Sequence, residues 1–86
     1  MSYSYQIERP FVFTEKGQEK LLAVRDWTLQ QLTVAGAIRA QEMLSQAGPG
    51  DSWALMAIID RLVELKDIRE IPTDGAWQHR VFVRQR

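Results

Sequence analysis

The part of the sequence that most constrains the fold is 51–86, where a helical pattern leads directly into a hairpin pattern. Asp51 or Ser52 can accept hydrogen bonds from the unpaired amides of a first helical turn. The apolar residues that follow recur every three or four positions, as one buried face of a helix requires. They are Leu55, Ile58, Ile59, Leu62 and Leu65. The sequence therefore predicts a helix over 53–66.

Two β-rich runs, 68–71 and 79–83, come after this helix. The pair Asp74-Gly75 lies between them, and it is typical of a hairpin turn because both residues tolerate positive φ. We therefore expect a C-terminal β-hairpin.

The register of this hairpin is left open by the sequence. A two-residue turn sets Arg69 opposite Arg80, which is an unfavourable pair of like charges. A longer or bulged connection brings Glu70 to Arg80 instead. The single histidine, His79, is expected to be a surface residue of the hairpin that pairs with a neighbour such as Glu70.

The composition is that of an ordinary soluble domain. The chain has 86 residues, of which 45% are hydrophobic and 26% are charged, so we expect one domain over 1–86 with a single core. It has no cysteine, which excludes disulfides and thiolate chemistry and favours a cytoplasmic protein. The N-terminal residues lack the pattern of a signal peptide, and no apolar run reaches the ~20 residues that cross a bilayer.

The N-terminal segment 1–13 has the pattern of extended chain. Tyr3, Tyr5 and Ile7 alternate with polar residues, which is the period of a strand with one buried face. Pro10 interrupts this pattern, and 11–13 follows as a second extended piece. Such a strand either covers the core or pairs with its copy in a homodimer.

Thr14 has the features of an N-cap, and a first helix is predicted over 15–27. Gly17 is a mild weakness in this helix, and the segment 28–32 is expected to be a connector. The lysines and other charged residues of this helix are expected to stay in water. Its predicted buried residues are Leu21, Leu22, Val24 and Trp27.

A second helix is predicted over 34–46, with Thr33 as its cap. Its many alanines make it slim, so that another helix can approach it closely. The turn Gly48-Pro49-Gly50 ends it, because glycine suits the left-handed C-terminal position and proline cannot continue a helix. The third helix begins immediately afterwards.

This order of elements resembles the winged helix-turn-helix superfamily over about 14–83, and the most telling run is 59–71. The resemblance implies an α+β fold with three helices and a C-terminal β-hairpin wing, to which 1–13 adds an extended segment. It also implies a short strand at Leu32-Thr33 and a wing tip at 73–78. Such proteins commonly have glycine where Lys66 stands, so we expect Lys66 or Asp67 to adopt a left-handed conformation.

The usual DNA mode of this superfamily implies that helix three enters the major groove, starting with Ser52 and Trp53. Its other outward residues are Met56, Ala57, Asp60, Arg61 and Glu64. This surface is acidic, because 51–71 carries a net charge of minus two, and phosphate attraction supplies most nonspecific affinity.

The wing compensates, because 72–86 carries a net charge of plus two, from Arg80, Arg84 and Arg86 against Asp74 alone. The first two have the same parity along the strand, so both are expected to point away from the face that buries Val81 and Val83. Together with Trp77 they form a predicted grip on the nucleic-acid backbone. The alternative is that these arginines are only the solvated face of an edge strand.

The three tryptophans are expected to have different environments. Trp27 is expected in the core. Trp53 either packs on the preceding loop or stands exposed as an interaction anchor. Trp77 lies beside the predicted wing tip and is expected to be exposed or to pack on Arg80.

The sequence gives little support for catalysis. It has one histidine and no cysteine, so no Cys-His pair is possible, and a Ser-His-Asp triad would place His79 in a hairpin without a loop that could form an oxyanion hole. No metal site or cofactor is predicted. The resemblance implies a small DNA-binding transcriptional regulator that contacts duplex DNA through Ser52, Trp53 and the basic wing. The alternative is a protein-interaction module that docks on a larger transcription or replication protein through Trp53, Met56 and Asp60.

Overall fold

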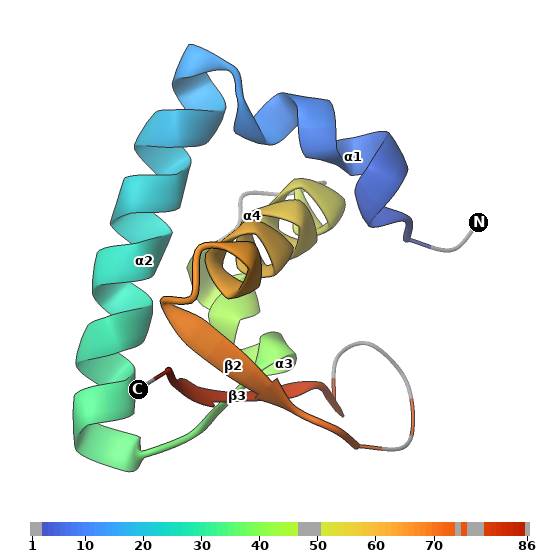
Figure 1. Ribbon diagram of the computed structural model, residues 1–86. Helices are drawn as coiled ribbons and strands as arrows, with labels where there is room; N and C mark the ends of the chain where they lie inside the picture. Colours follow the sequence, from blue (N-terminus) through green and yellow to red (C-terminus); the bar gives the residue numbers. More distant parts are fainter. Residues whose placement is uncertain (1–2, 47–50, 74, 76–78, 86) are drawn as a thin grey trace.

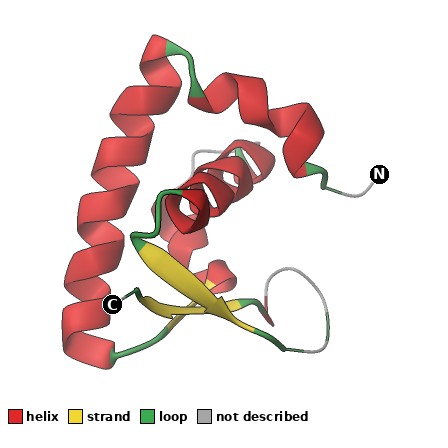
Figure 2. Cartoon of the chain, viewed as in Figure 1, coloured by secondary structure: helices red, strands yellow, loops and turns green. Residues whose placement is uncertain are grey.

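Helix α4 (Ser52–Glu64) lies in the middle of the molecule, with two helices around it on one side and a small sheet on the other (Figure 1). The computed structural model describes residues 3–46, 51–73, 75 and 79–85. Within these residues the fold is α+β, with four α-helices and one three-stranded antiparallel sheet (Figure 2). The remaining elements are α1 (Tyr5–Val12), α2 (Glu15–Ala35), β1 (Ile38–Arg39), α3 (Ala40–Met43), a 3-10 turn η1 (Leu44–Gln46), β2 (Ile68–Ile71) and β3 (Val81–Arg84).

The prediction of α4 is confirmed, except that the helix ends at Glu64 and the predicted buried residue Leu65 lies beyond it and is 44% exposed. Five consecutive residues, from Leu55 to Ile59, are buried, and so is Leu62. A helix that is apolar on more than one face must be covered from more than one side. The core is therefore built around α4. Asp51 is its N-cap residue, as predicted, but its side chain makes no capping hydrogen bond.

The end of α4 contains the predicted left-handed residue, which is Lys66 with φ 66°. The Lys66 amide donates to the Val63 carbonyl, and the Asp67 amide donates to the Leu62 carbonyl, at 3.1 Å each. These two bonds are those of a Schellman motif, which satisfies the last carbonyls of a helix and usually places glycine at this position. The chain then turns directly into β2.

The sheet has the strand order β1-β3-β2. The hairpin uses the longer connection, because Arg69 pairs with Val83 and Glu70 with Phe82. The predicted orientation of β3 is wrong. Phe82 is fully buried, whereas Val81 and Val83 are half-buried, so the arginines of even number share their face with a core residue. The face of β3 that packs against the helices is therefore the one that carries Phe82, and Val81 and Val83 lie on the opposite face.

Helix α2 is longer than predicted, and no connector interrupts it at 28–32. Thr28 and Leu32 continue the buried stripe that begins at Leu21 and Val24, so the helical period carries on. Its start is confirmed, because the Thr14 hydroxyl accepts a hydrogen bond from the Gly17 amide at 3.0 Å. Leu22 is wrongly predicted as core, since it is 50% exposed, and Trp27 is half-buried against the core.

The predicted second helix is mostly wrong. Thr33 caps nothing, since its hydroxyl donates to the Leu29 carbonyl inside α2. Gly36, with φ 83°, ends α2, and the short strand lies at Ile38 and Arg39 instead of Leu32-Thr33. Ile38 pairs with Phe82, which draws this part of the chain into the sheet. The Gly48-Pro49-Gly50 turn lies outside the described residues.

The predicted extended pieces at 3–7 and 11–13 are also wrong, because most of this segment forms α1. Helical spacing places Tyr5, Glu8 and Val12 on one side, and Val12 is fully buried. Pro10 lies inside this helix, where it removes one backbone donor, and its side chain is exposed. Without a strand at 3–7, the homodimer predicted through strand pairing loses its structural basis.

Candidate functional site: a groove at the start of helix α4

Helix α1 crosses α4 on the side that the sequence assigned to DNA (Figure 1). The Tyr3 hydroxyl donates to Asp60 Oδ2 at 2.6 Å, and the Tyr5 hydroxyl donates to Glu64. Arg9 Nε lies 3.8 Å from Glu64 Oε1. These contacts join residues almost sixty positions apart in the sequence, and they hold α1 on the second half of α4.

Both tyrosines titrate abnormally because of this packing. Burial and the hydrogen bond to Asp60 raise the pKa of Tyr3 above its ordinary value. Burial and the hydrogen bond to Glu64 likewise raise the pKa of Tyr5. The hydrogen bond from Tyr5 lowers the pKa of Glu64, with a further contribution from Arg61. The docked helix thus favours neutral phenols and a charged carboxylate.

Phe13 adds an aromatic contact at the end of α1. Its ring centroid lies 4.7 Å from the Arg9 guanidinium carbon and 5.0 Å from that of Arg61. Guanidinium groups at this distance are attracted to the face of an aromatic ring. Arg61 is therefore engaged with α1 rather than presented as a free cation.

The outward surface predicted for α4 is not open. Met56 and Ala57 are fully buried, and Asp60 is bonded to both Tyr3 and Arg80. Of the alternative protein-docking set, Met56 is therefore buried and Asp60 is engaged, whereas Trp53 lies at a hollow of the surface. The sequence predicted that one apolar face of α4 is buried, but it did not predict that α1 covers α4 as well.

Arg80 holds three elements together instead of standing free in the wing. Its Nη2 lies 2.7 Å from Asp60 of α4 and 2.7 Å from Glu70 of β2, and its side chain is only 21% exposed. Burial acts to lower the pKa of Arg80, but the hydrogen bonds with Glu70 and Asp60 outweigh it and hold the pKa above the ordinary value. Glu70 therefore pairs with Arg80 and not with His79, which is exposed.

The structure describes only some of the other residues predicted to form the wing grip. Arg84 is exposed, as predicted. Trp77 and Arg86 lie outside the described residues. In the described part of the basic wing, Arg84 is thus exposed to water, and the charge of Arg80 is neutralised by two carboxylates.

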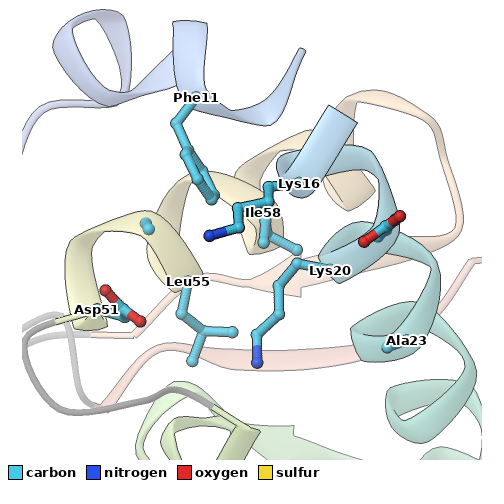
Figure 3. A pocket seen from close by; sticks show the side chains of 9 residues that line it. Phe11, Lys16, Lys20, Ala23, Asp51, Leu55 and Ile58 are labelled. Atoms are coloured by element: carbon cyan, nitrogen blue, oxygen red, sulfur yellow. The ribbon is translucent and has the colours of Figure 1, made fainter. Parts of the chain in front are cut away.

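A groove opens at the start of α4, where α1, α2 and α4 meet. Its first part has a volume of about 510 Å³. Phe11 of α1 and Leu55 and Ile58 of α4 provide large apolar surfaces, and the side chains of Lys16 and Lys20 extend over them from α2 (Figure 3). The remaining lining residues are Glu19, Ala23, Asp51 and Ala54.

The second part of the groove has a volume of about 440 Å³ and continues past Phe11. It shares Phe11, Asp51 and Ala54 with the first part and adds Glu8, Ser52 and Trp53. We call the two parts together the α4 groove. Trp53 is half-buried here, so it neither packs fully into the core nor stands free.

The charges of the α4 groove are unevenly distributed. Lys16 and Lys20 lie on its α2 wall, and no ion pair is formed by either within the described part of the chain. Asp51 lines both parts, and Glu8 lines the second part near Trp53. Glu19 adds one negative charge to the lysine wall.

No histidine or cysteine is among the described residues that line the groove. Among residues 3–46, 51–73, 75 and 79–85, no cluster of three or more histidine, cysteine, aspartate or glutamate side chains has a geometry that could hold a metal ion. In the same residues no helix has the length and apolar character needed to cross a membrane. What the groove offers is an apolar floor with charged rims.

Comparisons with protein-family models, with curated proteins and with solved structures find no match for this chain.

Two predicted site residues, Ser52 and Trp53, do lie together in the groove. Phe11, Lys16 and Lys20 were missed. The two lysines are four residues apart on a predicted helix, which is a usable signal for a common face, but they were assigned to the solvated side. Phe11 was assigned to extended chain, so nothing in the sequence placed it against α4.

Proposed function

We propose that the chain is a protein-interaction module of winged-helix architecture, which binds a segment of a partner protein in the α4 groove. The order α2, β1, α3, α4, β2, β3 supports the architecture, because it is the order of helices and strands in the resemblance over 14–83. The left-handed Lys66 supports it as well, since it stands where glycine is common.

The observation that carries the proposal is the position of α1. It lies across the α4 surface that a DNA reader would insert into the major groove, and it is fixed there by Tyr3, Tyr5 and Arg9. The same helix forms one wall of the groove through Phe11. An arrangement that covers a DNA-reading surface while building an apolar groove favours a protein ligand.

A DNA-binding regulator remains the second candidate, and the outer face of the sheet favours it. Residues directly paired across strands share a face, so Arg39 lies beside Val81 and Arg69 beside Val83. Arg84 is exposed, but it pairs with Ile68 and so belongs to the other face of the sheet. On the outer face, Arg39 and Arg69 are exposed, and neither has an ion-pair partner in the described ranges. This face could contact phosphates without the help of α4.

One pair of experiments separates the two candidates. In the first, a library of random peptides is displayed and selected against the full chain, then tested against Ala54→Arg, which fills the groove, and against Val34→Arg, which adds the same side chain at an exposed site elsewhere. We expect selected peptides to bind the wild type and Val34→Arg equally, and Ala54→Arg at least about tenfold more weakly. The proposal would be contradicted if the selected peptides bound Ala54→Arg as tightly as the wild type, or if the selection gave no binding peptides.

In the second experiment, labelled random-sequence duplex DNA is titrated at low salt and at about 0.15 M salt. The variant carries Arg39→Ala, Arg69→Ala and Arg84→Ala together. We expect no appreciable binding near physiological salt. Binding that persists there and is lost in the triple variant would favour the DNA regulator instead.

A further inference from the structure

We propose that the C-terminal hairpin controls whether α1 stays docked on α4, because Arg80 supplies the positive charge that allows the N-terminal segment to cover the Asp60 carboxylate. The segment concerned is 3–12, which runs across α4 and which we call the N-terminal strap (Figure 1). It has two states in this account, docked and released. The inference does not depend on what the α4 groove binds.

The contacts of α1 itself are too few to keep the strap docked firmly. Only Val12 of its eight residues is fully buried, while Ile7 is 73% exposed and Pro10 removes a backbone donor. A helix of this length is not stable alone in water. Its two polar contacts with Glu64 lie at the surface, where such pairs contribute little. Release of the strap therefore needs less free energy than unfolding of the whole molecule.

The contact between Tyr3 and Asp60 is of a different kind, because it covers a charge. The Tyr3 hydroxyl donates to Asp60 Oδ2 at 2.6 Å, and Arg80 Nη2 donates to Asp60 Oδ1 at 2.7 Å. With the strap docked, the Asp60 side chain is only 17% exposed. A carboxylate so far removed from water needs a cation to compensate for its lost hydration. Arg80 is the cation that pairs with it in the described part of the chain.

Loss of the Arg80 charge has two opposite effects on the strap. The hydrogen bond from Tyr3 becomes stronger, because the phenol then has less competition for Asp60. The unpaired carboxylate, however, regains its hydration only if the strap moves away. The second effect is larger, because one neutral donor replaces a small part of the hydration of an ion. Glu70, the other partner of Arg80, is 34% exposed and can be hydrated without such a movement.

The state of the strap matters for the α4 groove, because Phe11 of α1 lines both of its parts. A ligand that draws Arg80 away from Asp60 removes this wall of the groove. By linkage, a ligand held against Phe11 favours the docked strap and with it the pair of Asp60 and Arg80. This consequence rests on the proposed function, whereas the control of the strap by Arg80 does not.

The test is native-state hydrogen exchange of the full chain, followed by NMR at the amides of α1 and α4. In the wild type we expect the α1 amides to exchange through release of the strap, at rates that low concentrations of urea hardly change, because release exposes little surface. Arg80→Met should accelerate this exchange about tenfold, which is a fraction of the effect of an uncompensated buried charge. Arg84→Met, at the exposed end of β3, should leave it unchanged.

The decisive comparison adds Asp60→Asn to Arg80→Met. The asparagine oxygen still accepts a hydrogen bond from Tyr3, but no charge remains beneath the strap, so α1 exchange should return to within about twofold of the wild type. All variants are also compared in about 1 M sucrose, which favours the compact state, so that the least stable of them can be measured.

Three results would overturn the inference. If the α1 amides exchange at the wild-type rate in Arg80→Met, the hairpin does not control the strap. If exchange is equally fast with and without Asp60→Asn, Arg80 acts through packing and not through the charge of Asp60. If the α1 amides of the wild type are as protected as those of α4 and respond equally to urea, the strap is released only when the whole molecule unfolds. None of these results bears on peptide binding in the groove, which the display selection tests separately.

Discussion

At the scale of single residues, Gly17 shows how a local weakness can be a structural requirement. Glycine in a helix normally costs stability, and the sequence alone indicates nothing more. In the structure, a Cβ atom at this position would lie 2.0 Å from the Phe11 carbonyl oxygen. The corner between α1 and α2 therefore depends on the missing side chain.

Gly17→Ala is expected to destabilise the protein by about 2 kcal/mol, although the same change in an open helix stabilises it by about 1 kcal/mol. The reason is that backbone atoms of α1 must move to admit the methyl group. Urea denaturation measures the change, and Gln30→Ala on the exposed side of α2 should shift stability by less than about 0.5 kcal/mol. A more stable Gly17→Ala variant would show that the corner is not tight.

Thr28 presents the opposite case, a polar group in the core without a partner. It is fully buried, and its hydroxyl has no hydrogen bond to any described residue. Thr28→Val replaces the hydroxyl with a methyl group of similar size, so we expect a gain of about 1 kcal/mol in the free energy of unfolding.

The control for this prediction is Thr33→Val, five residues further along α2. The hydroxyl of Thr33 is exposed and bonds the Leu29 carbonyl at 2.9 Å, so its removal should change the thermal midpoint little. A loss of stability in Thr28→Val would mean that its hydroxyl is satisfied in solution.

At the scale of elements, the sequence predicted those whose pattern is local. The apolar period of α4 and the two strands of the hairpin follow from neighbouring residues. The left-handed residue at Lys66 or Asp67 was expected from the family resemblance. Helix α2 was cut short because 28–32 was interpreted as a connector, although Thr28 and Leu32 continue the buried stripe. Helix α1 was missed because alternating Tyr3, Tyr5 and Ile7 fit a strand, while the contacts that decide its conformation come from α4.

The docking of α1 should depend on pH through Glu64. The hydrogen bond from Tyr5 lowers the pKa of Glu64, so this contribution is complete above the ordinary glutamate pKa of about 4.3 and is lost as the pH falls through the folded-state value. The raised pKa of Tyr5 acts at the other end, where its contribution is lost as the pH rises above about 10. Helix α1 should therefore be held best between about pH 5 and pH 9.

NMR titration of the Glu64 carboxyl carbon tests this account. Tyr5→Phe should move its midpoint up towards the ordinary value, because the phenol no longer stabilises the carboxylate. Tyr3→Phe removes the bond to Asp60 instead and should leave the Glu64 midpoint where it is. An unchanged midpoint in Tyr5→Phe would show that this hydrogen bond is absent in solution.

At the scale of the whole molecule, Arg80 joins the hairpin to the helical layer. We expect Arg80→Met to lower the free energy of unfolding by about 2 kcal/mol, because Asp60 and Glu70 are left half-buried without their cation. Arg84→Met, at the exposed end of β3, should cost less than about 0.5 kcal/mol.

A neutral version of the same cluster checks the cause. Adding Asp60→Asn and Glu70→Gln to Arg80→Met removes the two uncompensated charges and should recover part of the loss in a denaturant titration. The triple variant could instead be even less stable than Arg80→Met, beyond what the two added substitutions cost by themselves. In that case the stability lost in Arg80→Met comes from packing and not from the unpaired charges.

The α4 groove belongs to this scale too, and that explains why the sequence did not reveal it. Phe11, Lys16 and Leu55 come from three helices, and only the crossing of these helices brings them together. Ser52 and Trp53 were found because they begin a recognisable helix. A groove made by tertiary packing leaves no period in the sequence.

The contact between α1 and α4 also governs the order of folding. Tyr3 and Asp60 are 57 residues apart in the sequence, so their hydrogen bond closes a long loop, and loop closure of this length has a large entropic cost before any contact forms. An eight-residue helix containing proline is not stable by itself, so α1 cannot form early as a separate nucleus. Substitutions in α1 should therefore accelerate unfolding and leave the refolding rate almost unchanged. We therefore expect the first helix in the sequence to become structured late in folding.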